Sequence, residues 1–362
     1  MAKTGKRVRV KVFDFFAGCG GTSKGLASAG MEVILALDSD ADAEKTFKHN
    51  FPKAAFLRDD IRNIDTKALL PFVKACAGSL ILFSGCAPCQ PFSKQNGHRR
   101  RHDERSTLLD EFSRFVVRYK PDFVFCENVP GLQAIETNAG PFRRFLDALD
   151  ANGYPEANRV HRVVDAQDYG VPQRRRRLVL LASKHGPIVL PKPTHGPGGK
   201  PYSTVWEWIG DLPALKAGET NRSDPNHRAA LLSALNLRRI KATPPGGTRL
   251  DWPEELKLEC HKGNHRGHTD VYGRLRKDQP ASSMTTRCVS LSNGRFGHPE
   301  QDRAISVREA ACLQTFPRNF RFFGSLDSTA RQVGNAVPVL LAKRMGEVFM
   351  REAAKLKTPR RR

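Results

Sequence analysis

The chain has 362 residues, and its 60 Lys and Arg outnumber 37 Asp and Glu, which gives a formal net charge of +23. This excess favours a polyanionic partner, with nucleic acid the first candidate, and arginines cluster at 99–101, 174–177 and 360–362. The sequence lacks an apolar run long enough to span a membrane and an N-terminal signal segment. We therefore expect a cytoplasmic protein whose eight cysteines are reduced thiols.

Short apolar runs alternate with segments of helical spacing through the first half of the chain. The pattern predicts strands at 8–16, 33–37, 56–57, 80–83, 123–126, 160–164 and 177–182. It predicts helices at 23–29, 41–50, 66–76, 107–119 and 142–151. Strands that alternate with helices indicate a doubly wound, mostly parallel α/β sheet, and the last two strands suggest an antiparallel pair.

After residue 183 the pattern changes. The segment 187–201 is rich in Pro and Gly and is typical of a linker, and 202–300 shows only weak periodicity. Helices are predicted again at 307–313 and 338–357, and the second of these should pack back onto the first domain. The chain is thus predicted to hold one large α/β domain and a smaller, irregular one.

The stretch 84–93 (SGCAPCQPFS) follows the apolar run at 80–83. Its glycine and prolines break regular structure, so its cysteines should lie on a loop at a strand end, where open α/β sheets bind ligands. Prolines on either side stiffen the loop around Cys89, which favours a nucleophile at this position. Taken alone, the stretch also permits a core cysteine, or redox or metal chemistry by the pair Cys86 and Cys89.

A glycine turn follows the first predicted strand. Gly18, Gly20 and Gly21 let the backbone approach a ligand closely. Asp38 ends the next strand about 20 residues on, the spacing of a carboxylate that accepts ribose hydroxyls. Because Ser23 replaces the third glycine of the dinucleotide fingerprint, a nucleoside cofactor such as S-adenosylmethionine suits the turn better than NAD. The alternative is an ordinary tight turn.

Six motifs occur in the order in which DNA cytosine-5 methyltransferases carry them. They are 13–21 (FDFFAGCGG), 88–90 (PCQ), 127–129 (ENV), 173–177 (QRRRR), 308–317 (REAACLQTFP) and 332–338 (QVGNAVP). The chain therefore resembles that family, in its bacterial and phage modification type, over nearly its whole length. Cys86 departs from the pattern, since many members carry glycine there, but a small side chain still fits.

The resemblance implies a Rossmann-like fold of the S-adenosylmethionine-dependent methyltransferase type with a second, smaller, irregular target-recognition domain. We expect residues 1–190 plus 325–362 to form the catalytic and cofactor-binding domain. The target-recognition domain and hinge are expected at 191–324.

The resemblance also implies the chemistry. Carbon 5 of cytosine becomes a nucleophile once a thiolate adds to carbon 6, and Cys89 is expected to supply that thiolate. Glu127 would contact N3 and the exocyclic amine and share a proton with the ring. Arg175 and Arg177 would hold the O2 atom of the base and a nearby phosphate. Their spacing beside a predicted strand should place both on one side.

Cofactor and DNA contacts follow from the same motifs. Residues expected to bind S-adenosylmethionine are Phe16, Gly18, Gly20, Gly21, Asp38, Asp60, Ile61, Asn335, Ala336 and Val337. Residues expected to bind DNA are Gln90, Ser93, Arg99, Arg100, Arg101 and Gln173. The basic loop 94–105 resembles the mobile loop that closes over DNA in this family, the alternative being an uninvolved basic loop.

The smaller domain should read the DNA sequence, and Arg274, Arg276 and Arg287 could touch phosphates or guanines. The spacing of Cys260, His261, His265 and His268 could bind zinc. No second cysteine pair completes such a site, so we expect no metal.

The sequence thus predicts an enzyme that methylates carbon 5 of a flipped cytosine in a specific duplex DNA sequence, through a covalent adduct between Cys89 and carbon 6. The closest alternative is the same chemistry on RNA, such as tRNA. A thiol oxidoreductase and a catalytically silent DNA-binding protein are further alternatives. We expect a nucleoid-associated monomer without membrane contact, and a restriction endonuclease of the same specificity as a potential partner.

Overall fold

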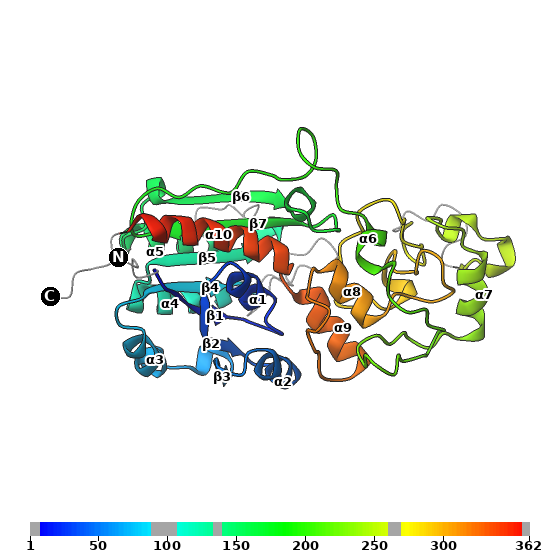
Figure 1. The fold of residues 1–362 in the computed structure, drawn as a ribbon, viewed down its shortest axis with the longest axis horizontal. Helices are drawn as coiled ribbons and strands as arrows, with labels where there is room; N and C mark the ends of the chain where they lie inside the picture. The colour runs from blue at the N-terminus through cyan, green and yellow to red at the C-terminus, as the bar shows by residue number, and fades with distance from the viewer. Residues whose placement is uncertain (1–7, 88–106, 133–139, 260–268, 357–362) are drawn as a thin grey trace, which may run out of the picture. The chain divides into compact units, whose positions relative to one another are not determined.

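The computed structural model describes residues 8–87, 107–132, 140–259 and 269–356. The chain divides into two compact units, drawn in Figure 1. The first unit comprises Met1–Asp165, Arg176–Lys192 and Val337–Arg362, and the second comprises Ala166–Arg175 and Pro193–Ala336.

The first unit is built on one sheet. Among the described residues its strands are β1 (Val10–Phe15), β2 (Glu32–Asp38), β3 (Ala55–Arg58), β4 (Leu80–Gly85), β5 (Phe123–Asn128), β6 (Arg159–Asp165) and β7 (Arg176–Ser183). They lie in the order β3-β2-β1-β4-β5-β7-β6. The first five of this order are parallel, and β7 runs antiparallel to both β5 and β6. This confirms the predicted mostly parallel sheet and the late antiparallel pair.

The strand order reverses between β1 and β4, which are hydrogen-bonded neighbours although β2 and β3 separate them in sequence. In open α/β sheets such a reversal leaves a crevice at the carboxyl ends of the strands, where ligands bind. The glycine turn follows β1 at this edge, and the cysteine-containing loop follows β4.

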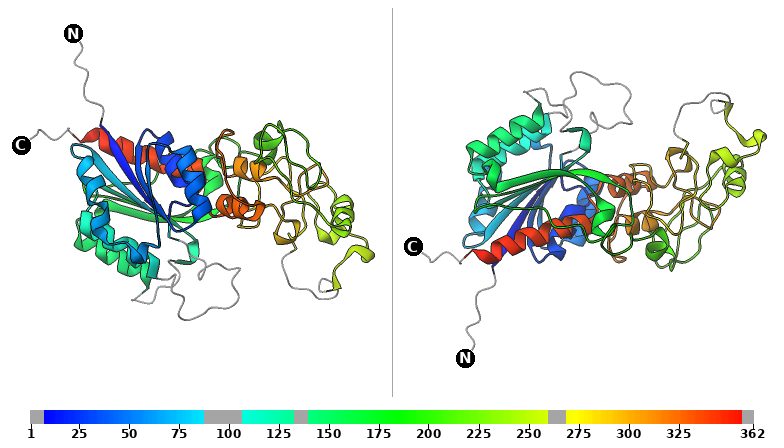
Figure 2. Two further views of the ribbon diagram at one scale, coloured as in Figure 1. Left: turned by 90° about the horizontal axis from the view of Figure 1, so that it is seen from below. Right: turned by 90° about the horizontal axis from the view of Figure 1, so that it is seen from above.

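Helices cover both faces of the sheet (Figure 2). They are α1 (Gly21–Ser28), α2 (Ala41–Asn50), α3 (Leu70–Ala75), α4 (Leu108–Tyr119), α5 (Pro141–Ala151) and α10 (Val339–Lys355). α1 and α10 lie together on one face, and α4 and α5 cover the other. We call these the α1 face and the α4 face.

Alternation along the strands decides which side chains meet each face. On β1, the Phe15 ring lies 5.1 Å from the rings of Phe112 and Phe115 in α4, so its neighbour Asp14 points to the α1 face. On β5, Phe123 and Phe125 contact Phe349 of α10, so Glu127 also belongs to the α1 face. Two acidic side chains are therefore directed to the same side of the sheet.

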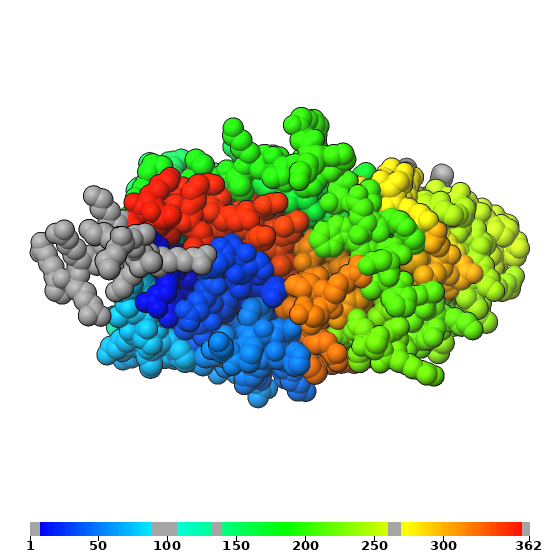
Figure 3. All heavy atoms as spheres, viewed as in Figure 1, coloured from blue at the N-terminus to red at the C-terminus, as the bar shows by residue number. Residues whose placement is uncertain are grey.

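The long C-terminal helix packs back onto the first unit, as predicted, and does so against α1 (Figure 3). Gly25 makes the close approach possible. A Cβ atom there would lie 2.5 Å from the carbonyl oxygen of Val339 and 2.4 Å from the Cβ of Ala342. The two helices are thus in backbone contact at this point.

The second unit is largely irregular. Its described helices are α6 (Val205–Ile209), α7 (Ala234–Ala242), α8 (Val307–Leu313) and α9 (Leu326–Asn335). One apolar cluster gathers around Trp252, Tyr272 and Ile240. A buried ion pair adds a polar centre, because both oxygens of Glu309 accept hydrogen bonds from Arg303 at 2.7 Å. Of these helices the sequence predicted only α8, since the others are short or weakly periodic.

The observed division differs from the one expected from sequence, since Pro191 and Lys192 belong to the first unit and two longer segments belong to the second. Residues 166–175 and 325–336 belong to the second unit. Backbone hydrogen bonds join Arg174 and Pro172 to Ala281, all within that unit. Gly334 of α9 packs so tightly that a Cβ atom would lie 2.0 Å from the carbonyl oxygen of Thr285. Packing against the middle of the chain therefore draws both segments out of the first unit.

Two element boundaries also differ. Residues 66–76 do not form one helix, because Pro71 lies at the start of α3 and the preceding turn, η2 (Thr66–Leu69), is a 3₁₀-helix. Glu127 and Asn128 lie inside β5 rather than after it. Within the described ranges, no helix is both long and apolar enough to cross a membrane.

We expect Gly25→Ala to lower the free energy of unfolding by about 1–3 kcal/mol, because the added methyl group overpacks the contact between α1 and α10. Intrinsic helix propensity alone would favour alanine by about 1 kcal/mol, so the sign of the change separates the two effects. Urea unfolding measures it. Ser28→Ala, at an exposed position of the same helix, is the control and should change little. A Gly25→Ala protein as stable as the parent would contradict the packing.

Candidate functional site

The glycine turn has the backbone geometry of a ligand-binding loop. Gly18 and Gly20 have φ angles of 51° and 95°, in the left-handed region that favours glycine. Phe16 also has a positive φ, 57°, which is uncommon for a bulky residue and is typical of strained functional loops. At Gly20 a Cβ atom would lie 2.7 Å from the ring of Phe51, so no side chain fits there.

Asp38 fixes the turn. Its Oδ2 accepts a hydrogen bond from the backbone N–H of Gly18 at 2.8 Å, and its Oδ1 accepts one from Asp40 at 3.0 Å. Burial raises the pKa of this carboxyl, against the lowering effect of the two N–H donors. Each carboxylate oxygen has a second lone pair, so Asp38 can hold the turn and still accept a hydroxyl hydrogen bond from a ligand.

Asp60 and Ile61, two further predicted cofactor residues, have defined partners in the first unit. Asp60 caps the 3₁₀-turn η1 (Ile61–Asn63) and forms hydrogen bonds with the Arg62 guanidinium at 3.0 and 2.7 Å. This interaction lowers the pKa of Asp60. The side chain of Ile61 is 2% exposed and belongs to the apolar core. Asp60 is therefore the more accessible of the two to a ligand.

The end of β5 holds the start of the cysteine-containing loop. Asn128 donates a hydrogen bond from Nδ2 to the carbonyl oxygen of Ala87 at 3.1 Å. Two residues earlier, the thiol of Cys126 donates to the carbonyl oxygen of Gly85 at 3.0 Å. The backbone that leads toward Cys89 is thus attached to its neighbouring strand at two points.

Glu127 is paired with Arg177 across two strands of the same unit. Arg177 Nε lies 3.0 Å from Glu127 Oε1, and the two side chains are 15% and 9% exposed. The angles are not those of a hydrogen bond, and Glu127 Oε1 accepts none from the described residues. The site therefore offers a nearly buried carboxylate oxygen, next to a guanidinium, with capacity for another partner.

Cys86 is a partly buried neighbour of this pair. Its Sγ lies 3.7 Å from Oγ1 of Thr22 in α1. Burial, with the charges of Glu127 and Asp14, raises the pKa of the Cys86 thiol well above its usual value. A thiol in this state is a poor nucleophile and a poor redox partner.

Gln173 and Arg175 lie in the second unit, where they hold backbone segments together. The guanidinium of Arg175 donates to the carbonyl oxygens of Met284 (2.7 Å), Gly334 (3.1 Å) and Ala336 (3.3 Å), and the residue is 3% exposed. Gln173 accepts from the N–H of Met284 and donates to the carbonyl oxygen of Leu313. Three segments that are distant in sequence are joined by these two side chains.

The structure therefore brings Glu127 and Arg177 together in the first unit, and Arg175 belongs to the second unit. Exposure does alternate along 174–177, as expected, because Arg175 is buried while Arg174 and Arg176 are exposed. The predicted cofactor residues Asn335 and Ala336 belong to the second unit, and Val337 begins the last segment of the first.

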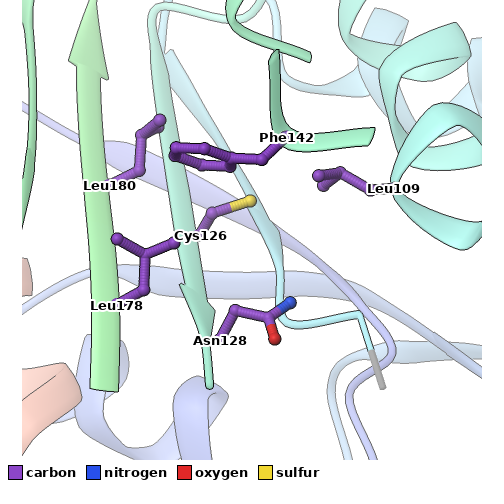
Figure 4. Close-up of a pocket in the computed structure, with 6 residues that line it drawn as sticks. All are labelled: Leu109, Cys126, Asn128, Phe142, Leu178 and Leu180. Atoms are coloured by element: carbon purple, nitrogen blue, oxygen red, sulfur yellow. The ribbon is translucent and has the colours of Figure 1, made fainter. Parts of the chain in front are cut away.

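A small cavity lies on the α4 face and is shown in Figure 4. Its lining is mostly apolar: Leu109, Cys126, Asn128, Phe142, Leu178 and Leu180. The two polar lining residues already bond the backbone of Gly85 and Ala87. Because Glu127 points to the opposite face, this cavity is not part of the site built around it.

Several predicted site residues lie outside the described residues. They are Cys89, Gln90, Ser93, Arg99, Arg100 and Arg101. Cys260, His261, His265 and His268, whose spacing was considered for zinc, also lie outside them. In the part of the chain that the structure does describe, no group of three or more His, Cys, Asp or Glu side chains could hold a metal ion.

Arg274 does not fit its predicted role as a DNA contact. It is 4% exposed, pairs with Asp302 at 2.5 Å and donates to the carbonyl oxygens of Ile240 and Thr243. A guanidinium held in this way supports the fold of the second unit. Arg276 and Arg287, by contrast, are exposed.

Sequence reasoning missed four polar residues around the site. Asp14, Ser23 and Ser84 form a buried group beneath the glycine turn, and Asn128 holds the loop. An acidic residue between two phenylalanines of a predicted strand was the available signal for Asp14.

The family model of the C-5 cytosine-specific DNA methylases matches residues 10–351 of this chain. The chain belongs to this family, and it is a DNA cytosine-5 methyltransferase.

Similar proteins include the Type II methylase M.HgiDII of Herpetosiphon aurantiacus, which is 42% identical over 338 residues, with 92% of each chain covered. The Type II methyltransferase M1.HphI of Haemophilus parahaemolyticus is 34% identical over 342 residues, covering 93% of this chain and 86% of its own. Among solved structures, a putative DNA modification methyltransferase encoded within an E. coli prophage superimposes with a TM-score of 0.73 at 23% identity, covering 96% of this chain and 100% of that one. This last likeness concerns the fold.

The contacts of the two arginines predict different results for the same substitution. Arg175→Lys should lower the free energy of unfolding by about 2–4 kcal/mol, because lysine cannot reach three buried carbonyl oxygens at once. Arg177→Lys should cost about 1 kcal/mol or less, since its partner stays next to a positive charge. Urea unfolding of both variants measures the difference. Equal costs would show that the carbonyl contacts of Arg175 do not support the fold.

Proposed function

We propose that this enzyme transfers a methyl group from S-adenosylmethionine to carbon 5 of a flipped cytosine in a specific sequence of duplex DNA, through a covalent adduct between Cys89 and carbon 6. The observation that carries the proposal is the pairing of Glu127 and Arg177 on the α1 face. The glycine turn follows β1 and the Cys89 loop follows β4, so three adjacent strands contribute to one edge of the sheet.

The residues around the glycine turn suit the proposed cofactor. Bound S-adenosylmethionine supplies an electrophilic methyl group. Gly18 and Gly20 have no side chains, so the backbone of the turn can approach the ligand closely. Asp38 has a lone pair that can accept a hydrogen bond from a ribose hydroxyl. The carboxylate of Asp60 is partly exposed and can accept a hydrogen bond from the adenine amine. Asn335, Ala336 and Val337 are proposed as further contacts on the ground of their motif.

The protein side chains then have separate tasks in the reaction. The Cys89 thiolate adds to carbon 6, and the electron pair displaced from the C5–C6 double bond makes carbon 5 a nucleophile toward the methyl group. Glu127 shares the proton that N3 gains, and it accepts a hydrogen bond from the exocyclic amine of the base. After methylation the C5 proton leaves to a base, the double bond re-forms and Cys89 is expelled. The paired guanidinium of Arg177 can stabilise charge at O2 of the ring.

Arg175 supports a different proposal from the one that its motif implies. Its donors are directed at three carbonyl oxygens in the second unit. We therefore assign the contact with the base to Arg177 and a positioning role to Arg175. Gln173 shares that role, because it binds the same segment at Met284.

Duplex DNA is the proposed substrate because of the net charge of +23 and the names of the relatives. A basic protein gains affinity for DNA by releasing counterions from the phosphates. Exposed arginines of the second unit, Arg276 and Arg287, are candidates for such contacts. Since the relatives are Type II methylases, we also propose that the enzyme protects a site that a cognate restriction endonuclease cuts. The enzyme is proposed to act as a monomer.

The thiol-oxidoreductase alternative is weakened by Cys86. A redox pair of Cys86 and Cys89 needs one thiol that ionises readily. Burial instead raises the pKa of Cys86 well above its usual value. The proposed reaction uses Cys89 alone.

The two cysteines can be tested as a matched pair. Cys89→Ser should abolish methyl transfer, because a serine hydroxyl is far less acidic than a thiol, while folding and cofactor binding are preserved. Cys86→Ala should keep most of the activity. The measurement is covalent trapping by DNA that contains 5-fluorocytosine, since fluorine cannot leave as the C5 proton does.

The parent and Cys86→Ala should form the trapped adduct on a denaturing gel, and Cys89→Ser should not. An adduct that survives in Cys89→Ser and disappears in Cys86→Ala would overturn the assignment of the nucleophile.

A further inference from the structure

Asp14 is an unneutralised carboxyl group inside the first unit. It is 1% exposed on β1, between the fully buried rings of Phe13 and Phe15. Among the described residues, no Lys, Arg or His side chain forms an ion pair with it. Burying a carboxylate without a counter-charge is costly, so a protein that keeps one at this depth needs a compensating partner.

The partners that Asp14 does have are two serines on the α1 face. Ser23, in the first turn of α1, donates from Oγ to Asp14 Oδ2 at 2.6 Å. Ser84 is the register neighbour of Asp14 on β4 and is also fully buried. Ser84 is close enough to lower the pKa of Asp14, yet neither its Oγ nor Asp14 Oδ1 has a hydrogen bond of normal geometry within the described residues. One carboxylate oxygen of Asp14 thus has no neighbour among these side chains other than the Ser84 hydroxyl.

The position of this group matters as much as its charge. Asp14 lies two residues before the strained Phe16 and four before Gly18, at the point where the strand order reverses. Burial is the main cause that raises the pKa of Cys19 in the turn and of Cys86 after β4, and the charge of Asp14 adds to both shifts. The field of the carboxylate therefore reaches both the proposed cofactor turn and the start of the Cys89 loop.

We propose that Asp14 is the buried counter-charge for the cationic sulfonium end of S-adenosylmethionine, and that its bond to Ser23 positions the glycine turn for this ligand. The inference rests on the proposed function. It also gives a means of product release, because methyl transfer removes the positive charge of the sulfonium and leaves the carboxylate without its partner. Asp14 acts by its charge and by positioning the turn, so it is not a catalytic residue.

The protonation of Asp14 should be coupled to cofactor binding. Burial is the main cause that raises its pKa to about 6, the serine hydrogen bonds oppose this, and the charge of Asp38 adds to it. A bound cation favours the ionised form and lowers that pKa. Affinity for S-adenosylmethionine should therefore rise as the pH increases through about 6 and then level off. The groups that act on Asp14 are Ser23, Ser84 and Asp38, and Glu127 points to the same face of the sheet. The nearby thiols of Cys19 and Cys86 have raised pKa values and stay neutral, which leaves Asp38 and Glu127 as the other acidic groups.

The test is calorimetry of the full-length protein with S-adenosylmethionine and with the uncharged-sulfur product S-adenosylhomocysteine, between pH 5 and 7.5. Asp14→Asn should weaken binding of S-adenosylmethionine at pH 7.5 by about tenfold, the effect of a one-unit change in a linked pKa, and should flatten its pH dependence. The product should lose much less affinity. Asp38→Asn is the matched control, and it should weaken both ligands equally because both carry the same ribose.

Two results would overturn the proposal: unchanged affinity of Asp14→Asn for S-adenosylmethionine, or an equal loss for both ligands. If Asp14→Asn does not fold, Ser23→Ala decides. Loss of its hydrogen bond should raise the pKa of Asp14 and move the binding profile to higher pH, and an unmoved profile would exclude Asp14 as the titrating group. A parent protein that binds neither ligand would instead contradict the proposed function itself.

Discussion

The alternation of side chains at the end of β5 is the constraint on which the site depends. Cys126 and Asn128 point to the α4 face and hold the carbonyl oxygens of Gly85 and Ala87. Glu127, between them, points to the α1 face and meets Arg177. A shift of one residue in the register of β5 would exchange these roles, because each side chain would move to the opposite face. One short strand thus fixes the loop that leads to Cys89 and also orients the carboxylate proposed to contact the base.

Buried carboxylates are paired differently in the two units. In the second unit Arg303 and Glu309 neutralise each other through two hydrogen bonds at 2.7 Å. Such a closed pair has no capacity left for a ligand and serves the fold. In the first unit, Glu127 Oε1 and Asp14 Oδ1 accept no hydrogen bond from the described residues. Both are at the edge of the sheet where the proposed cofactor and base would enter, which is where incomplete pairing is useful.

Features set by local sequence were predictable. The apolar runs predicted the strands, and the glycines predicted the turn. The position of a carboxylate next to an apolar strand indicated Glu127 as a site residue. Contacts between distant segments were not. Arg175 binds Met284, Gly334 and Ala336, each more than a hundred residues away, and its motif, which suggests a contact with the base or a phosphate, does not reveal these carbonyl partners. The same long-range packing places α9 in the second unit. Asp14 was missed because alternation along a strand does not reveal whether a polar residue has a partner.

The central claim is that this chain methylates carbon 5 of cytosine in one DNA sequence, and the most direct measurement is bisulfite sequencing of plasmid DNA from cells that express it. The account predicts 5-methylcytosine at a single recurring sequence in the duplex, and none when the empty vector is used. Fully converted cytosines throughout the plasmid, in cells where the folded enzyme is present, would contradict it.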